Sequence, residues 1–164
     1  MKQLAHVKPA CRIQLIDPQD CARMLDLVKK IPEHFWYPRT SLQTGRGMDG
    51  ATCDYGWITQ RSMPKHLSEE MVRLAPKVDG LELDDWVINR YLPGQYMGRH
   101  RDRDPIPYNA VIPLQAFGDG IKIEDTFYPD EVGVGAVFFG PTPVHEVPPV
   151  QHERYVLVYL LTEK

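Results

Sequence analysis

A histidine and an aspartate separated by one residue, His100 and Asp102, stand in the segment "GRHRDRDP". If this segment is a strand, the two side chains share one face and both can reach the same ion. His145 follows the apolar run "GAVFFG" and is the best candidate for a third ligand from elsewhere in the fold. The spacing therefore predicts a metal site built from His100, Asp102 and His145.

Two histidines and one carboxylate on one face form the triad typical of non-haem Fe(II) oxygenases, which leaves coordination positions open for a cosubstrate and dioxygen. The same ligands could also hold zinc for hydrolysis or in a non-enzymatic module. A His-x-Asp pair alone also occurs in solvated charged loops. Two other residues compete for the ligand roles. His152 lies directly before the final strand, and Asp104 is farther along the strand from His100.

An arginine at the start of an otherwise apolar strand, Arg154 in "RYVLVYLL", suggests a second function for this region. Arginine is the natural bidentate partner of a carboxylate in a partly dry pocket. The far carboxylate of 2-oxoglutarate needs such a cation when its keto-acid end binds iron. Asn89 and Tyr91 share one face of the strand "INRYL" and could donate hydrogen bonds to the same cosubstrate.

Two helices are expected to support the site. Residues 17–30 have Asp17 as N-cap, Pro18 in the first turn and apolar residues at i, i+3, i+4 and i+7. A second, shorter helix is expected to begin at Ser68 and to end near Pro76. The region between them, 38–63, is rich in Gly, Thr and Ser, and we expect it to form loops and short strands that act as a substrate flap.

From residue 85 onwards the chain is a series of short β-branched and aromatic runs, separated by Gly, Pro and Asp turns. These runs are "DWVINRYL", "YNAVIPLQAF", "GIKIEDTFY", "GAVFFG" and "RYVLVYLL". Strands at this spacing favour a sandwich or barrel over βαβ units. The prediction is a mainly β (α+β) fold with helical N-terminal support. The 164 residues are expected to form a single domain, 1–164.

Charge, cysteine content and hydropathy indicate the partners and the cellular compartment to expect. The formal net charge is -3, so no overall basic field indicates a nucleic-acid partner, although a local basic groove remains compatible with it. The three cysteines form no C-x-x-C pair and suggest a reducing environment. The sequence shows neither a signal-peptide pattern nor an apolar run long enough for a membrane span. We therefore expect a cytoplasmic monomer without membrane contact.

The segment "INRYLPGQYMGRHRDRD" resembles the core motif of the AlkB family of Fe(II)/2-oxoglutarate-dependent dioxygenases. The matching residues are Asn89, Tyr91, Gly94, His100 and Asp102, and the family's distal histidine and Arg-led final strand are similar to His145 and "RYVLVYLL". The resemblance covers roughly the last two thirds of the chain. It implies a double-stranded β-helix (jelly-roll) fold, with Fe(II), 2-oxoglutarate and O2 as cofactor and cosubstrates.

The resemblance also implies a substrate. AlkB-like enzymes act on alkylated bases, so we expect hydroxylation or demethylation of such a base, with release of succinate and CO2. The base would be flipped or single-stranded, with Trp57 and Tyr55 as stacking candidates and Arg61 as a further contact. The basic residues on the expected flap and rim segments are Arg39, Arg46, Arg61, Lys65, Arg99, Arg101 and Arg103. The core-residue interpretation of Trp57 is equally compatible with the sequence.

The chain departs from the repair-type pattern at two positions. Val156 and Leu160 stand where those relatives carry Asn and a second Arg, so cosubstrate binding would depend more on Arg154, Tyr91 and Asn89. This departure and the acidic net charge leave open an alternative function. In that alternative the chain is a 2-oxoglutarate-dependent hydroxylase of a protein side chain or a small metabolite.

Overall fold

The computed structural model describes residues 11–42, 51–102 and 108–164. Arg46, Arg103 and Asp104, and part of the expected flap, lie outside the described residues. No described helix has both the length and the apolar character needed to cross a membrane.

The helices lie in the N-terminal half. They are α1 (Pro18–Lys29), the 3-10 turn η2 (Glu33–Phe35) and α2 (Lys65–Leu74). Asp17 caps α1 as expected, because its carboxylate accepts a hydrogen bond from the Gln19 amide at 2.8 Å. The predicted start of α2 at Ser68 was wrong. Pro64 presets the backbone so that the helix begins at Lys65, and the Ser68 hydroxyl instead accepts a hydrogen bond from Trp86 Nε1 at 3.1 Å.

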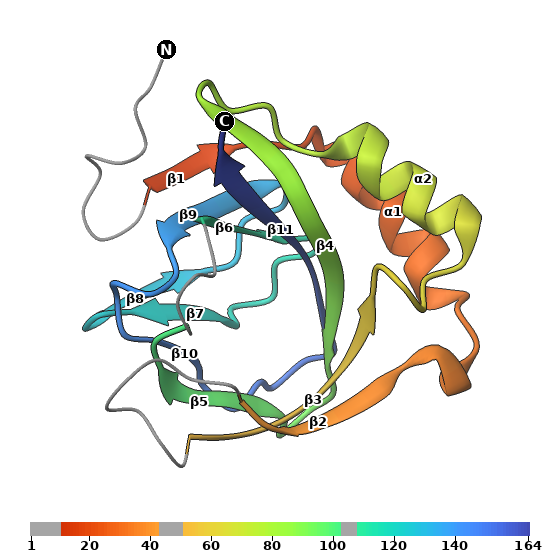
Figure 1. Cartoon of the computed structure of the whole chain (residues 1–164). Coiled ribbons are helices and arrows are strands. Elements are labelled where there is room, and N and C mark those ends of the chain that lie inside the picture. The colour runs from red at the N-terminus through yellow and green to blue at the C-terminus, as the bar shows by residue number, and fades with distance from the viewer. Residues whose placement is uncertain (1–10, 43–50, 103–107) are drawn as a thin grey trace.

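The described strands form one strongly curled sheet in which neighbouring strands pair antiparallel (Figure 1). The strand order is β1-β9-β6-β11-β4-β3-β5-β10-β7-β8, with β2 paired to β3. Their bounds are β1 Cys11–Gln14, β2 Tyr37–Ser41, β3 Thr52–Thr59, β4 Leu81–Tyr91, β5 Tyr96–His100, β6 Tyr108–Pro113, β7 Gly120–Ile123, β8 Thr126–Pro129, β9 Val134–Phe139, β10 His145–Val147 and β11 Arg154–Glu163. The expected mainly β, jelly-roll-like double-stranded β-helix is confirmed.

Two predicted runs differ from the structure in detail. Residues 120–128 form a hairpin, β7–β8, because the chain reverses at Glu124, whose φ of 54° places it in the left-handed region. In the run that starts at Tyr108 the strand ends at Pro113, and Leu114 still donates its N–H to the Tyr155 carbonyl of β11 at 3.1 Å. Within residues 38–63 the described parts include β2 and β3, which pair with each other.

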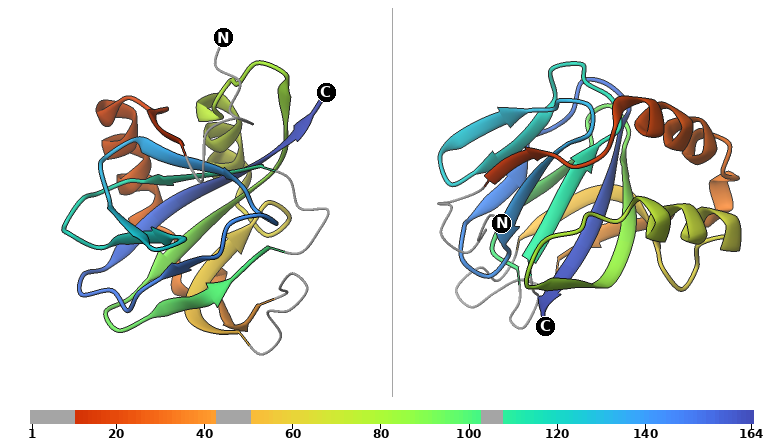
Figure 2. Two further views of the ribbon diagram at one scale, coloured as in Figure 1. Left: turned by 90° about the vertical axis from the view of Figure 1, so that its left-hand side faces the viewer. Right: turned by 90° about the horizontal axis from the view of Figure 1, so that it is seen from above.

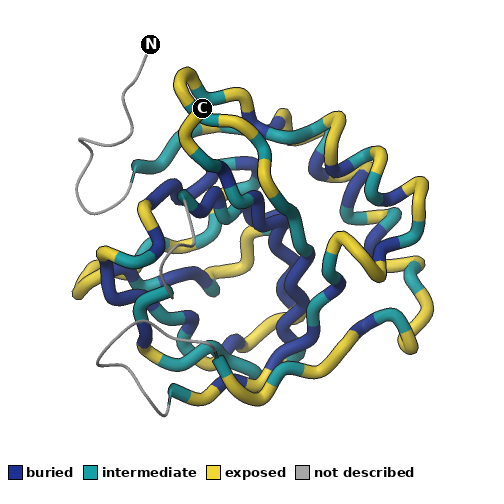
Figure 3. Tube along the Cα trace, viewed as in Figure 1, coloured by how far each residue is buried: buried dark blue, intermediate teal, exposed yellow. Residues whose placement is uncertain are grey.

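Burial is most continuous along β11, where the first six residues are all buried, and buried residues are dark blue in Figure 3. On β11, Tyr155, Leu157, Tyr159 and Leu161 pack in the same hydrophobic cluster as the two helices. The intervening residues Arg154, Val156, Val158 and Leu160 face a cavity inside the curl. The alternation of side chains along a strand therefore separates a structural face from a site face.

The helices cover the outer face of this sheet and leave the inside of the curl to other side chains (Figure 2). Cys21, Met24 and Val28 of α1, with Leu67 and Met71 of α2, belong to the outer cluster and are fully buried. The helices pack on the outer faces of β4, β6 and β11, and the inner faces of these strands line the cavity.

Truncating the helical layer is expected to weaken the whole fold. Leu67→Ala should lower the free energy of unfolding by about 2–5 kcal/mol, because it removes a fully buried side chain and leaves a cavity. Val72→Ala on the same helix removes a side chain that is 48% exposed and should change stability by less than about 0.5 kcal/mol. Urea unfolding measures both, and equal losses would contradict this description of α2.

Candidate metal centre

The predicted ligands come together where one end of β5 lies beside one end of β10. His100 ends β5 and His145 begins β10, and the two residues are directly paired in the ladder. Asp102 follows β5 by two residues, and its Oδ1 lies 3.3 Å from His100 Nε2 and 3.2 Å from His145 Nε2. The three ligand atoms all lie within 4.8 Å of one another. His100 and His145 are 3% and 4% exposed, so the cluster is enclosed by protein.

Backbone carbonyls define which ring nitrogen of each histidine is available. His100 Nδ1 lies 2.7 Å from the Gly98 carbonyl, and His145 Nδ1 lies 3.0 Å from the Pro143 carbonyl. A carbonyl accepts a hydrogen bond only from an N–H, so each Nδ1 carries the proton. In the neutral rings both Nε2 atoms then present lone pairs to the Asp102 carboxylate. Three acceptors at one point need a positive charge between them, either a proton on an Nε2 atom or a metal ion, and a metal ion satisfies all three acceptors at once.

The second oxygen of Asp102 is held by the protein. Asn109 of β6 donates a hydrogen bond from Nδ2 to Asp102 Oδ2, and the Asp102 amide donates to the Gly140 carbonyl at 3.1 Å. A Cβ added at Gly140 would lie only 2.1 Å from Asp102 Oδ2, so the carboxylate packs directly on this glycine. Oδ2 is thereby fixed away from the histidines, and Oδ1 is left as a single ligand atom.

Charge at the cluster favours the ionised carboxylate. Burial alone would raise the pKa of Asp102, but hydrogen bonds and positive charge from His100 and His145, whose rings carry a second proton when no metal ion is bound, outweigh it and hold this pKa well below its usual range. Asp102 is therefore a carboxylate at any ordinary pH. An anionic oxygen with two imidazoles matches the donor set of a divalent transition metal.

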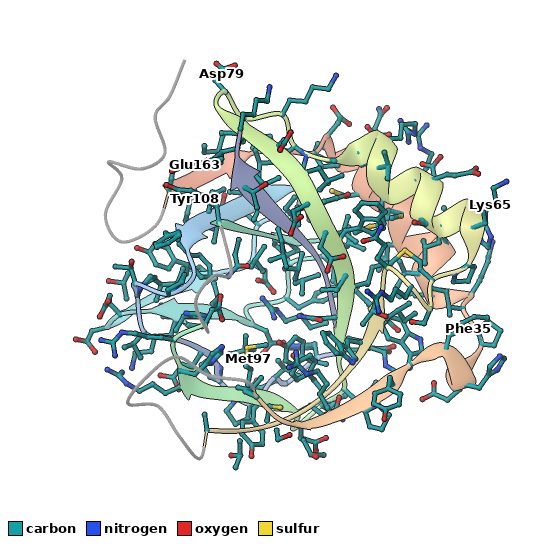
Figure 4. All side chains as sticks on the ribbon, in the orientation of Figure 1. Phe35, Lys65, Asp79, Met97, Tyr108 and Glu163 are labelled. Carbon is teal, nitrogen blue, oxygen red and sulfur yellow. The ribbon has the colours of Figure 1, made fainter. Side chains whose placement is uncertain are left out.

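The cluster opens into a cavity of about 390 Å³ inside the curl. Figure 4 shows the side chains around this region, and it labels Met97 of β5, which lines the cavity. Alternate residues of β4 and β11 form one wall in four rows, Tyr91 opposite Arg154, Asn89 opposite Val156, Val87 opposite Val158 and Asp85 opposite Leu160. The apolar residues Val156 and Leu160 thus line the cavity at the positions where repair-type AlkB proteins carry polar side chains.

Arg154 lies in the cavity wall and is tied to an aspartate after β8. Its Nε and Nη2 donate to the two carboxylate oxygens of Asp130 at 2.7 and 3.0 Å, and the two side chains are 2% and 5% exposed. Nη1 is buried and has no hydrogen-bond partner in the parts of the chain that the structure describes. Asp130 therefore occupies one edge of the guanidinium and leaves the Nη1 end for an anion in the cavity.

The other two expected cosubstrate residues also line the cavity. Tyr91 is 1% exposed, and its ring centroid lies 5.2 Å from the Arg154 guanidinium. Burial raises the pKa of Tyr91 well above its usual range, so its hydroxyl keeps its proton and can donate it. Asn89 Oδ1 is buried without a partner among the described residues, and an orphaned polar atom of this kind calls for a ligand or water.

The three residues expected to contact the substrate do not all lie in the same cavity. Tyr55 and Trp57 line the cavity, but Tyr55 is 1% exposed and stacks on Tyr91 at 5.0 Å. One face of Trp57 is covered by the Arg39 guanidinium at 3.9 Å. Arg61 lies outside this cavity and lines a different surface hollow with Asp84 and Asp85. The competing histidine His152 is 52% exposed and pairs with Asp119, away from the cluster.

Sequence reasoning missed three residues that shape the site, Asn109, Asp130 and Gly140. Asn109 gave a usable signal, because an amide within the apolar run "YNAVIPL" needs a buried partner. Asp130 and Gly140 follow strand ends, where aspartate and glycine are ordinary turn residues. Only the folded arrangement identifies what they contact.

No model of a known protein family matches this chain, and no curated protein matches it. Solved structures do. An oxidoreductase of the 2OG-Fe(II) oxygenase family from Burkholderia pseudomallei matches with a TM-score of 0.71 and 20% identity, over 98% of this chain and 87% of that chain. A viral collagen prolyl hydroxylase from Paramecium Bursaria Chlorella virus-1, solved with 2OG, matches with a TM-score of 0.60 and 16% identity, over 98% of both chains.

A non-heme alpha-ketoglutarate dependent epimerase from nogalamycin biosynthesis is also similar, with a TM-score of 0.66 and 11% identity over 93% of this chain and 77% of that chain. At these identities the likeness concerns the fold. It does not extend to the narrower AlkB resemblance, since none of the three structures is described as an AlkB protein. The chain thus has the curled double-stranded β-helix that these oxygenases share.

Proposed function

We propose that this chain is a Fe(II)- and 2-oxoglutarate-dependent dioxygenase that hydroxylates a small metabolite or a protein side chain. The observation that carries the proposal is the convergence of His100 Nε2, His145 Nε2 and Asp102 Oδ1, three acceptor atoms at the inner end of a cavity. The ligand set leaves positions free for a cosubstrate, as the two-histidine, one-carboxylate triad does elsewhere. The cavity supplies a cation, Arg154, for the far carboxylate of that cosubstrate.

Bound Fe(II), 2-oxoglutarate and O2 would supply the oxidising chemistry, in which 2-oxoglutarate yields succinate and CO2 while a substrate C–H becomes C–OH. The chain's own residues would hold the metal ion and orient the cosubstrate. Asn109 and Gly140 fix Asp102 so that only Oδ1 faces the metal position. Arg154 Nη1 receives the far carboxylate, and the Tyr91 hydroxyl donates to it. Val156, Val158 and Leu160 keep this part of the cavity apolar and exclude water.

The cavity favours the metabolite or side-chain substrate over the alkylated base that the sequence motif suggested. The Tyr55 ring is stacked on Tyr91, and one face of the Trp57 ring is covered by Arg39. Each of the two expected stacking rings therefore already has one face occupied by a protein side chain. The structural neighbours include a collagen prolyl hydroxylase, which is named for a protein substrate, and an epimerase from nogalamycin biosynthesis. The prediction that the substrate is an alkylated base in nucleic acid has no comparable support.

The direct test is succinate release. Purified protein with Fe(II), 2-oxoglutarate and O2 should release succinate, and His100→Ala should abolish this release because one of three ligands is lost. His152→Ala, which removes an exposed histidine away from the cluster, should behave as wild type. Release that persists in His100→Ala, or is absent from the iron-loaded wild type, would refute the proposal.

A second prediction concerns the packing of Asp102 on Gly140. Gly140→Ala should weaken Fe(II) affinity by about 10- to 100-fold, because the new Cβ displaces Asp102 Oδ2 and rotates the ligand oxygen. Gly56→Ala is the control, since its Cβ would meet atoms only at an ordinary 3.7 Å. Calorimetric titration under anaerobic conditions measures both. Wild-type affinity in Gly140→Ala would show that Asp102 is not the ligand in this geometry.

A third prediction concerns Asp130. Asp130→Asn should raise the KM for 2-oxoglutarate on the order of tenfold, because Arg154 loses the partner that holds its Nη1 end toward the cavity. Fe(II) affinity should stay the same. Asp125→Asn, at a carboxylate that is 93% exposed, serves as the control. A KM that falls in Asp130→Asn would mean that Asp130 competes with the cosubstrate for Arg154 and does not position it.

A further inference from the structure

A row of four side chains crosses the cavity wall from β11 to β2. Arg154 is paired with Tyr91 in the β11–β4 ladder, and Arg39 is paired with Tyr55 in the β2–β3 ladder. The two tyrosine rings stack at 5.0 Å, and all four residues line the same cavity. The row therefore carries one guanidinium at each end of a tyrosine pair.

The two guanidiniums differ in their charge balance. Arg154 is neutralised by Asp130 through two hydrogen bonds. Arg39 makes no ion pair with any carboxylate in residues 11–42, 51–102 and 108–164. A cation that lines a largely apolar cavity without a counter-charge is poised to bind an anion.

Arg39 is also held in a defined orientation. Its Nη1 donates to the Tyr55 hydroxyl at 2.7 Å, and its guanidinium lies 3.9 Å from the Trp57 ring centroid. Both contacts fix the plane of the guanidinium before any ligand arrives, which lowers the entropic cost of binding. No acceptor in the described parts of the chain binds Nε or Nη2, which are donors for an incoming group.

The two arginines stand well apart in the sheet. Their strands are three ladder spacings apart, which separates the backbones of Arg39 and Arg154 by about 14 Å along the sheet. The five-carbon chain of 2-oxoglutarate spans roughly 7 Å, given C–C bonds of about 1.5 Å. With one end at the metal position and the other at Arg154, it leaves Arg39 for a different anion.

We propose that Arg39 is the specificity-determining cation for the hydroxylated substrate and that it binds a carboxylate on a small molecule with an apolar body. This inference rests on the proposed function and adds the substrate class. One guanidinium that has no ion-pair partner among the described residues balances one negative charge, which fits a carboxylate better than a phosphate monoester with a charge of about -1.5 to -2. The apolar body would pack on Trp57, Leu42, Val87 and Leu160, which line the cavity beside Arg39.

The size of the cavity limits the substrate. Its volume of about 390 Å³ is near the lower end of the range of roughly 300–1,000 Å³ found for ligand pockets. This space must hold 2-oxoglutarate as well as the second substrate. A small free carboxylic acid, with the reacting C–H near the metal position and the carboxylate at Arg39, satisfies both limits.

The test uses 3-phenylpropionate and its neutral analogue 3-phenylpropanamide as probes, each titrated calorimetrically into anaerobic protein saturated with Fe(II) and 2-oxoglutarate. The wild type should bind the acid at least about tenfold more tightly than the amide, because only the acid makes a charge-assisted hydrogen bond to Arg39. Arg39→Gln should lose this preference. Arg39→Lys, which keeps the charge, should retain part of it, and Arg61→Gln, outside the cavity, should retain all of it.

Three results would overturn the inference. The wild type could bind acid and amide equally, benzyl phosphate could bind more tightly than the acid, or Arg39→Gln could raise the KM for 2-oxoglutarate, which would assign Arg39 to the cosubstrate. Failure of the proposed function is recognised separately, since it appears as absent succinate release in the iron-loaded wild type. A thermal melt of Arg39→Gln near that of the wild type confirms that lost preference reflects binding and not misfolding.

Discussion

The centre of this molecule is an electrostatic conflict between Asp102 Oδ1 and the two imidazole nitrogens His100 Nε2 and His145 Nε2. Backbone carbonyls bind Nδ1 of both rings and so turn their lone pairs toward the carboxylate. A cation resolves the conflict, and the surrounding contacts keep the three atoms in place until it binds. Asn109 and Gly140 are part of this arrangement, since they restrain the oxygen that does not face the rings.

A strand that is buried on both faces, β11, makes this arrangement possible. The outer face of β11 packs with α1 and α2, which gives the strand a rigid support. Its inner face presents Arg154, Val156, Val158 and Leu160 to the cavity at the spacing of alternate residues. The antiparallel ladders then bring side chains from distant parts of the sequence into the same rows, as Arg39 with Tyr55 and Arg154 with Tyr91 illustrate.

The sequence predicted local features well and long-range contacts in part. The cap and proline of α1, and the grouping of His100, Asp102 and His145, follow from residue types and spacing. The start of α2 was misplaced because Pro64 begins a helix without any side-chain cap. The pairing of Arg154 with Asp130, and the contact of Gly140 with Asp102, depend on strand register and could not be read from composition. The substrate inferred from the motif likewise depended on Trp57 being free, whereas Arg39 covers one of its faces.

The proposed activity requires that the two histidines and the aspartate bind iron together. The most direct measurement is anomalous X-ray scattering, at the iron absorption edge, from crystals grown anaerobically with Fe(II) and 2-oxoglutarate. We expect one iron peak within about 2.0–2.2 Å of His100 Nε2, His145 Nε2 and Asp102 Oδ1, with the cosubstrate extending from it toward Arg154. An iron peak elsewhere, or 2-oxoglutarate bound away from Arg154, would contradict this expectation.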